Sequence, residues 1–451
     1  MPRKARIAFH VLYTTQYAYD LENILTSITY PSGRAVTYTL DQIGRIAQVD
    51  TTLNGNPKTL ASGISYLPYG GITGLTFGNS LLLSHGYDNQ YRTSSIVIGS
   101  ILSRTYGYDA NGNVNSIVDT EPLASDENAG LYTYQQSTNK LTQVQGELNV
   151  VYGYDANGNI TSANNRTFIY DLLNRLIRVE DNSTTIAEYR YNGLNQRIKK
   201  IVQGGTRIFH YDLAGHLIAE TSDTGQTLAE YVYLGDQVLC KISGEAAYYY
   251  HNDHLGTPQL LTNESQNVSW KAVYTSFGEA DIQVETIENP FRFPGQYYDP
   301  ETGLHYNYHR YYDPKTGRYL TPDPIGLKGG INLFVYALQN PINNADRLGL
   351  DVYDFIKWVP VVSKIVDICR CYKFGDEIDK GIKQCDQELD DCEKHDDPLS
   401  CMAKFIEKYT YSHDWGIARI NCVCKAVGKG NWIEGKKECA EKFAKCILLW
   451  L

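Results

Sequence analysis

The heptapeptide Gly-Tyr-Asp-Ala-Asn-Gly-Asn occurs twice in this chain, at residues 107–113 and again at 153–159. Related Tyr-Asp or Tyr-Asn units begin at Tyr170, Tyr191 and Tyr211, a spacing of about 20 residues. In each unit the Asp bonds nearby backbone groups and a Gly or Asn accepts positive φ, which makes a tight turn. One repeat therefore predicts one β-hairpin. Because a single hairpin cannot bury its own face, we expect the copies to stack into a continuous sheet.

The composition favours the same fold class. The 451 residues include 37 Tyr and 38 Gly but 2 Met, which suits short strands and tight turns rather than helices. The net charge of −10 is unlike that of a general nucleic-acid binder. The sequence contains no run of about 18 apolar residues, so we expect no membrane-spanning helix. The apolar stretch Ile7–Tyr13 is short and contains His10, so we do not interpret it as a Sec signal peptide and expect any export to use another route.

Two further motifs follow the repeats, Tyr-His-Asn-Asp-His-Leu-Gly-Thr-Pro at 250–258 and Trp-Lys-Ala-Val-Tyr-Thr-Ser-Phe-Gly at 270–278. Together with the Tyr-Asp units they resemble the Rhs/YD-repeat family, with residues 1–290 as its repeat region. The resemblance implies a curved or shell-like sheet of stacked hairpins around a toxic C-terminal segment. About 350 residues is short for a closed shell. The chain could therefore be an incomplete shell, an orphan fragment, or one component of a larger toxin complex.

Residues 291–350 resemble the Rhs repeat-associated core domain. The resemblance rests on the Asp-Pro-x-Thr-Gly strings at 299–303 and 313–317, on Thr-Pro-Asp-Pro-Ile-Gly-Leu at 321–327, and on the closing run Pro-Ile-Asn-Asn-Ala-Asp-Arg-Leu-Gly-Leu at 341–350. Members of this type are understood to cut themselves just after the closing Gly-Leu with a site like that of aspartyl proteases.

Carried over to this chain, the resemblance places the cut between Leu350 and Asp351, with Asp323 and Asp346 as catalytic carboxyls and Arg310 as an assisting cation. Two carboxylates held close together cannot both ionise easily. One can then activate water while the other protonates the carbonyl or the leaving amide. The alternative is that both aspartates are turn residues and the segment is a purely structural plug.

Two positions depart from the family pattern. Arg347 stands where the closing motif usually has Pro directly after its Asp. Tyr311 stands where some members have Asp directly after the residue equivalent to Arg310, and Asp313, two positions further on, is a candidate substitute.

The histidines do not predict a metal site. His305 and His309 have the i, i+4 spacing of a helix-borne metal pair, but they lie in an aromatic strand-turn context. His251 and His254 belong to the family motif. We therefore assign no metal and no cofactor.

Residues 351–451 contain nine of the ten cysteines. Cys385 and Cys392 are seven residues apart, as are Cys439 and Cys446, so on helices each pair would share one face. Two such helices packed antiparallel would allow Cys385–Cys446 and Cys392–Cys439 disulfides. We expect a small α-helical Cys-rich domain that acts in an oxidising location. Zinc bound by the two Cys-x-Cys pairs is the alternative.

Within this C-terminal segment, His413 and Asp414 are the best candidates for acid–base chemistry, although we favour a polar turn between helices as their explanation. The expected function is that of an Rhs-type polymorphic toxin, whose β-shell carries an effector and releases it by autoproteolysis against bacteria or host cells. Such a toxin implies an immunity protein and a secretion carrier, with the product secreted or on the cell surface by a non-Sec route. The alternative is a non-enzymatic surface or adhesion protein that binds carbohydrate and ends in a disulfide-stabilised cap.

Overall fold

The computed structural model describes residues 13–68, 70–119, 130–136 and 138–350. The chain divides into two compact units, and nearly all described residues belong to the first, Met1–Tyr19 with Leu25–Phe355. This unit is antiparallel β-structure with two short 3-10 turns, η1 (Gly326–Gly329) and η2 (Ala337–Gln339). In the described ranges no helix has the length and apolar character needed to cross a bilayer. The prediction of a mainly β protein is confirmed for this part, whereas the predicted helical Cys-rich domain lies outside the described residues.

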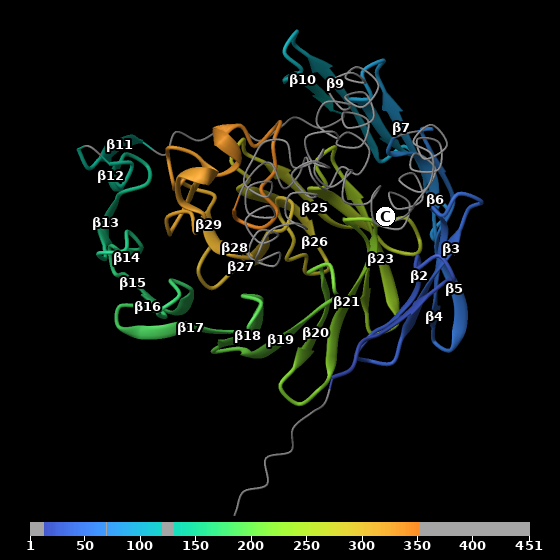
Figure 1. Cartoon of the computed structure of the whole chain (residues 1–451), viewed down its shortest axis with the longest axis horizontal. Helices are drawn as coiled ribbons and strands as arrows, with labels where there is room; N and C mark the ends of the chain where they lie inside the picture. Colours follow the sequence, from blue (N-terminus) through green and yellow to red (C-terminus); the bar gives the residue numbers. More distant parts are fainter. Residues whose placement is uncertain (1–12, 69, 120–129, 137, 351–451) are drawn as a thin grey trace, which may run out of the picture. The chain divides into compact units, whose positions relative to one another are not determined.

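Every strand pairs with its neighbours in sequence, which gives three antiparallel sheets (Figure 1). The first has ten strands: β1 (Gln16–Tyr19), β2 (Leu25–Thr29), β3 (Ala35–Leu40), β4 (Ile46–Leu53), β5 (Asn56–Tyr66), β6 (Ile72–Phe77), β7 (Leu82–Tyr87), β8 (Thr93–Ile98), β9 (Leu102–Tyr108) and β10 (Val114–Asp119). The second has sixteen: β11 (Leu131–Tyr134), β12 (Leu141–Gln145), β13 (Val150–Tyr154), β14 (Ile160–Ala163), β15 (Arg166–Tyr170), β16 (Leu176–Asp181), β17 (Thr184–Tyr191), β18 (Arg197–Val202), β19 (Gly205–Tyr211), β20 (Leu217–Ser222), β21 (Thr227–Leu234), β22 (Gln237–Ser243), β23 (Ala246–Asn252), β24 (Pro258–Thr262), β25 (Val268–Tyr274) and β26 (Ala280–Glu285). The third has four: β27 (Tyr297–Asp299), β28 (Leu304–Asn307), β29 (Arg310–Asp313) and β30 (Arg318–Tyr319).

The two residues of each Tyr-Asp unit have different structural roles. Asp171 Oδ1 accepts hydrogen bonds from the backbone N–H groups of Leu173 (2.9 Å) and Arg175 (3.0 Å), which close the turn between β15 and β16. The Tyr170 hydroxyl donates to the Ile160 carbonyl on the preceding strand (2.8 Å). Equivalent bonds are made by Tyr66, Tyr87, Tyr108, Tyr154, Tyr191, Tyr211 and Tyr274. Each of these tyrosines therefore ties its strand to the preceding one, in addition to the hydrogen bonds between the strands.

Strands β20 to β24 are buried on both faces, because side chains alternate between two cores. Tyr249 belongs to the core shared with the ten-stranded sheet, and its neighbour Tyr250 to the core shared with the four-stranded sheet. The buried Tyr30 hydroxyl donates to the Tyr231 carbonyl on β21 (2.8 Å) and so joins the first sheet to the second. Figure 1 shows the second sheet curving around the third.

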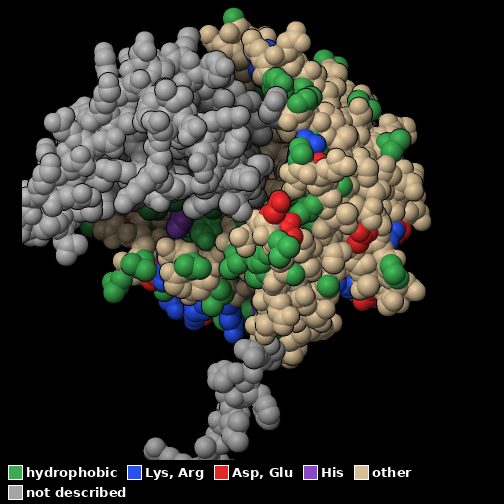
Figure 2. Space-filling view, turned by 45° about the vertical axis from the view of Figure 1, so that its right-hand side comes forward, with side chains coloured by type: hydrophobic (Ala, Val, Ile, Leu, Met, Phe, Trp, Pro, Cys, Tyr) green, Lys and Arg blue, Asp and Glu red, His purple; other side chains and the backbone are tan. Residues whose placement is uncertain are grey.

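The tips of several Tyr-Asp turns carry exposed leucines, among them Leu172, Leu194 and Leu213. On the face shown in Figure 2, hydrophobic side chains form small separate groups among polar ones. Isolated exposed apolar side chains are normal on a protein surface. These leucines therefore do not by themselves mark a site.

Candidate functional site

A buried ion-pair network holds the third sheet against the second. The Arg197 guanidinium on β18 bonds both carboxylate oxygens of Asp299 on β27, and Lys200 Nζ lies 2.9 Å from Asp299 Oδ1. Burial favours the neutral carboxyl, but Arg197 and Lys200 prevail and lower the pKa of Asp299 below its ordinary value. Five aromatic rings surround the guanidinium at 4.4 to 5.8 Å: Tyr189, Phe209, Tyr297, Tyr306 and Tyr311. This network holds the third sheet in place, and that sheet includes β29, which carries Arg310 of the candidate site.

Arg310 on β29 lies between the two aspartates that the resemblance singled out. Its Nη2 is 3.0 Å from Asp323 Oδ2 and 3.2 Å from Asp346 Oδ2. All three side chains are buried, with 2 to 4% of their surface exposed. The guanidinium is shared by both carboxylates, so it relieves the repulsion that a bare pair of acids would suffer.

Local structure fixes each aspartate. Asp323 begins the turn into η1, and its Oδ1 accepts the backbone N–H of Ile325 (2.9 Å). Asp346 lies in the closing segment, residues 341–350. Its Oδ1 accepts the backbone N–H of Leu350 (2.9 Å), and its Oδ2 accepts the hydroxyl of Tyr319 (2.8 Å). Asp346 therefore holds the chain immediately before the expected cleavage point.

The closing segment is also held through its main chain. Arg310 Nε donates to the Gly349 carbonyl (2.6 Å), and the His309 N–H donates to the Leu348 carbonyl (3.1 Å). Gly349 has φ of +71°, and a Cβ there would lie 2.5 Å from the Asn307 carbonyl oxygen. The glycine of the closing Gly-Leu pair is thus required by both conformation and space.

Gly329, the last residue of η1, lies against both Asp323 and the Leu350 carbonyl. A Cβ built on Gly329 would overlap Asp323 Oδ2 and lie 3.0 Å from the Leu350 carbonyl oxygen. These two oxygens therefore border the same small space. No local sequence pattern singles out Gly329, because its importance comes from a contact with Leu350, 21 positions away.

Asp313 lies apart from Arg310 and bonds within its own turn. Successive side chains on a strand point to opposite faces, so Tyr311 and Asp313 lie on the face of β29 away from Arg310. The Asp313 carboxylate accepts bonds from the Lys315 N–H (3.1 Å) and the Thr316 hydroxyl (3.0 Å) within its own turn. Position 311, where some members have Asp, lies on this same face, so the hypothesis that Asp313 substitutes for that Asp stays a prediction.

Arg347, in the usual Pro position, faces a charged group on the second sheet. Its Nη1 is 3.5 Å from Asp236 Oδ2. His216 lies 3.3 Å from the other oxygen of Asp236 and 2.9 Å from Asp212. Burial favours the neutral imidazole, but the hydrogen bonds to Asp212 and Asp236 prevail and raise the pKa of His216 to about 9. A chain of charges therefore connects the closing segment to the turns after β19 and β21.

The ion pairs of His216 predict a pH dependence of the stability of the folded protein. The folded-state pKa of His216 is raised above the ordinary 6.5, so its stabilisation is fully present below pH 6.5 and is lost as pH rises through 9. We expect the wild-type urea midpoint to fall between pH 6 and pH 9.5, with a loss on the order of 2–3 kcal/mol. His216→Gln should flatten this dependence. His210→Gln is the control, because burial lowers the pKa of His210 to about 4 and keeps it neutral throughout. Equal pH dependence in wild type and His216→Gln would contradict this assignment.

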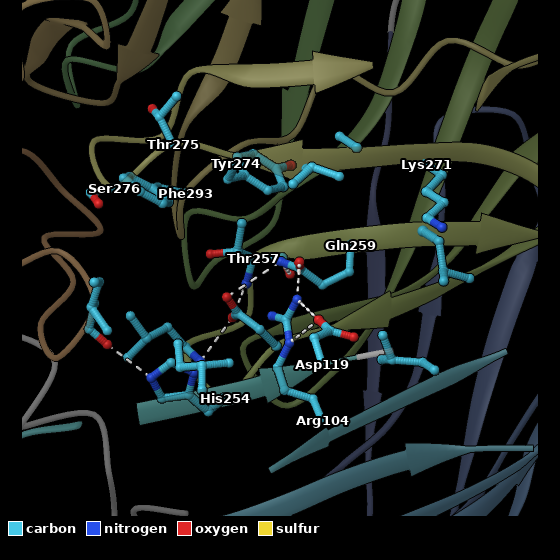
Figure 3. Close-up of a pocket in the computed structure, with 18 of the residues that line it drawn as sticks. Arg104, Asp119, His254, Thr257, Gln259, Lys271, Tyr274, Thr275, Ser276 and Phe293 are labelled. Carbon is cyan, nitrogen blue, oxygen red and sulfur yellow. Dashed lines mark hydrogen bonds and ion pairs between the residues drawn. The ribbon is translucent and has the colours of Figure 1, made fainter. Parts of the chain in front are cut away.

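A separate cavity of about 240 Å³ lies between β9, β10 and the strands β24 and β25, beside the closing segment (Figure 3). Arg104 pairs with Asp119 on one wall. His254 Nε2 bonds the Ile342 carbonyl (2.9 Å). Within the described ranges, Thr257 Oγ1 and His254 Nδ1 are buried without a hydrogen-bond partner. Both are unsatisfied polar atoms of residues that line the cavity.

The remaining predicted residues divide into two groups. Asp351, His413, Asp414 and the disulfide candidates Cys385, Cys392, Cys439 and Cys446 lie outside the described residues. The second group lies among the described residues. There His305 Nδ1 pairs with Gln296 Oε1 (2.6 Å), and His251 Nε2 pairs with Thr262 Oγ1 (2.8 Å). Both histidines thus have partners in the packed interior.

A model of the family described as Teneurin YD-shell matches residues 72–342, more than half of the chain. This chain belongs to the teneurin YD-shell family. The match includes strands from all three sheets and reaches the start of the closing segment. The predicted membership of the YD-repeat family is confirmed.

Similar proteins include two curated relatives and several solved structures. "Double-stranded DNA deaminase toxin A" of Burkholderia cenocepacia (strain H111) is 32% identical over 208 residues, which cover 41% of this chain and 14% of the relative. "tRNA nuclease WapA" of Bacillus subtilis (strain 168) is 26% identical over 340 residues, which cover 73% of this chain and 12% of the relative. The chain thus spans a small fraction of the length of either. The crystal structure of TcdB2-TccC3 has a TM-score of 0.61 at 18% identity, over 75% of this chain and 22% of that one. That likeness concerns the fold alone.

Proposed function

We propose that this chain is part of an Rhs-type polymorphic toxin that cuts itself between Leu350 and Asp351 and so releases residues 351–451 as an effector. The observation that supports it most directly is the buried contact of Arg310 with both Asp323 and Asp346 beside the segment that ends at Leu350. The names of the two curated relatives, a deaminase toxin and a nuclease, support the toxin role.

The chemistry would be hydrolysis of one peptide bond. Asp323, which borders the space beside the Leu350 carbonyl, takes a proton from water as the water oxygen attacks the carbonyl carbon. The proton then passes to the departing amide nitrogen, the C–N bond breaks, and a new carboxylate and a new amine result. Arg310 and Asp346 hold the chain in position, which replaces a binding step by proximity.

Cleavage within one chain has a rate independent of protein concentration. Freshly synthesised full-length protein, followed by gel electrophoresis over a wide range of concentrations, should therefore show one first-order rate constant. A rate that rises with concentration would contradict cleavage in cis, and a chain that stays uncut would contradict the proposal.

Gly329→Ala should slow cleavage by about 10²-fold, the penalty expected when reacting groups are displaced by about 1 Å. The new methyl group would overlap Asp323 Oδ2 and crowd the Leu350 carbonyl. Gly193 is the matched control, because its Cβ position has no neighbour within 4 Å and, like Gly329, it does not need a left-handed φ. Gly193→Ala should cleave at the wild-type rate in the same gel assay. Equal rates for both variants would refute the role of this space.

The proposal implies two kinds of partner. An effector that harms the producing cell requires an immunity protein, and delivery of the effector to a target cell requires a secretion carrier or a longer toxin-complex component. We expect expression of the full chain to arrest growth, a chain stopped after Leu350 to be harmless, and the product of the adjacent downstream gene to relieve the arrest. A harmless full chain would contradict the effector role.

A second candidate function is carbohydrate binding by an adhesion protein, at the cavity in Figure 3. Its support is the mixed lining of the cavity, in which the polar residues Thr257 and His254 stand beside the Tyr274 and Phe293 rings. At about 240 Å³ the cavity is below the roughly 300–1,000 Å³ of sites for drug-sized ligands, so it would take a single sugar ring. Calorimetric titration with monosaccharides should show binding that Thr257→Val weakens. No binding to the wild type would reject this function.

A further inference from the structure

The Tyr319 hydroxyl is buried inside the candidate site. It donates to Asp346 Oδ2 (2.8 Å), and the Tyr319 ring lies 3.6 Å from the guanidinium carbon of Arg310. Burial, reinforced by the Asp346 charge, raises the pKa of Tyr319 well above its ordinary value, although Arg310 opposes this. The phenol therefore keeps its proton and acts as a donor.

Asn307 on β28 determines where that proton points. Its Nδ2 donates to the Tyr319 oxygen (2.6 Å) and to the main-chain carbonyl of Asp346 (2.8 Å). Because the phenolic oxygen accepts from Asn307, its own proton is directed to the Asp346 carboxylate. Asn307 and Tyr319 are both fully buried, so water does not compete for these bonds.

The two aspartates consequently have unequal surroundings. Donors to the Asp346 carboxylate come from Tyr319, Arg310 and the Leu350 backbone. Asp323 accepts the Ile325 N–H and pairs with Arg310, and it also borders the space beside the Leu350 carbonyl. The charged and titratable groups around Asp346 are Arg310 on β29, Tyr319 on β30 and Tyr336 at the start of η2, with Asp323 across the shared guanidinium.

We propose that Tyr319, oriented by Asn307, is a positioning residue of the self-cleavage site. It holds Asp346 on the Leu350 N–H and so leaves Asp323 to act on the Leu350 carbonyl. This inference rests on the proposed function and assigns the two carboxyls different roles, one to hold the chain and one to move the proton.

Tyr319→Phe tests the assignment, with Tyr312→Phe as the matched control. Tyr312 pairs with Tyr319 across the β29–β30 ladder, is equally buried and belongs to the same aromatic cluster. Its hydroxyl donates to the Phe277 carbonyl (2.7 Å). Each variant removes one buried hydroxyl, but Tyr319→Phe alone removes the donor to Asp346 and the acceptor of the Asn307 amide.

We expect Tyr319→Phe to slow cleavage about 10- to 100-fold, as for the loss of one hydrogen bond to a charged group. The acid limb of its pH–rate profile should also move to higher pH, because the carboxylate loses a donor that favours its charged form. Tyr312→Phe should keep the wild-type limb.

The outcomes separate the two proposals. An uncut wild type would contradict self-cleavage itself. A cut wild type whose pH limb is unchanged in Tyr319→Phe would overturn only the positioning role. If Tyr319→Phe fails to fold by circular dichroism, Asn307→Leu decides, since it leaves the Tyr319 ring in place but frees its hydroxyl to turn. The same shift of the acid limb supports the role, and an unshifted limb rejects it.

Discussion

Asp323→Asn should leave the chain uncut between Leu350 and Asp351. Asp323 Oδ2 borders the same space as the Leu350 carbonyl oxygen and lies 3.0 Å from Arg310. An amide cannot exchange the proton that hydrolysis requires, so we expect the rate to fall about 10²- to 10⁴-fold. Asp346→Asn should also slow cleavage, because it puts an N–H group where Arg310, Tyr319 or Leu350 now donates. Quantitative gel electrophoresis at fixed times after synthesis measures both effects.

Asp313→Asn is the control for these variants. Asp313 ends the strand that begins with Arg310, but its carboxylate caps its own turn on the opposite face. The Asp313→Asn variant should therefore cleave at the wild-type rate. If Asp323→Asn cleaved as fast as Asp313→Asn, the assignment of Asp323 as the proton-transfer group would be wrong.

Arg197→Met should loosen the third sheet from the second. Arg197 and Asp299 are both completely buried, and removal of one partner leaves the other charge in the interior. Breaking a buried pair in this way costs about 3–5 kcal/mol. We expect the lower part of that range, because Lys200 still lies 2.9 Å from Asp299. The measurements are the urea midpoint and hydrogen exchange of residues 297–313. A midpoint is preferable to a single free energy, since a chain of this size need not unfold in two states.

Arg190→Met on the adjacent strand β17 is the matched control. Its side chain is 53% exposed and pairs with Glu188 at 3.0 Å. An exposed pair of this kind contributes about 1 kcal/mol or less. The double variant Arg197→Met/Asp299→Asn should recover part of the loss, because Lys200 keeps Glu301 as a partner (3.2 Å) and the charges balance again. Equal midpoints for Arg190→Met and Arg197→Met would show that the buried network does not anchor the third sheet.

The local part of the fold was predictable from sequence. The Asp of each unit closes its turn through bonds to residues two and four positions ahead, so a short motif contains all the necessary information. The packing of the sheets was not predictable in this way. Tyr30 meets the carbonyl of Tyr231, 201 residues later. The double burial of β20 to β24 likewise follows from segments distant in sequence.

The candidate site shows the same division. Asp323, Asp346 and Arg310 came from family resemblance, because each alone is indistinguishable from a turn residue or a surface charge. Tyr319 and Asn307 were missed, since nothing local separates this phenol from the other tyrosines of the chain. Strand alternation alone places Asp313 on the face of β29 away from Arg310, because its offset of three from Arg310 reverses the face.

The central claim is that the folded chain divides itself after Leu350. The most direct test is the intact mass of freshly purified wild-type protein, with terminal sequencing of any smaller product. The account predicts two fragments, one ending at Leu350 and the other beginning at Asp351. A single uncut mass from protein that circular dichroism shows to be folded would contradict it.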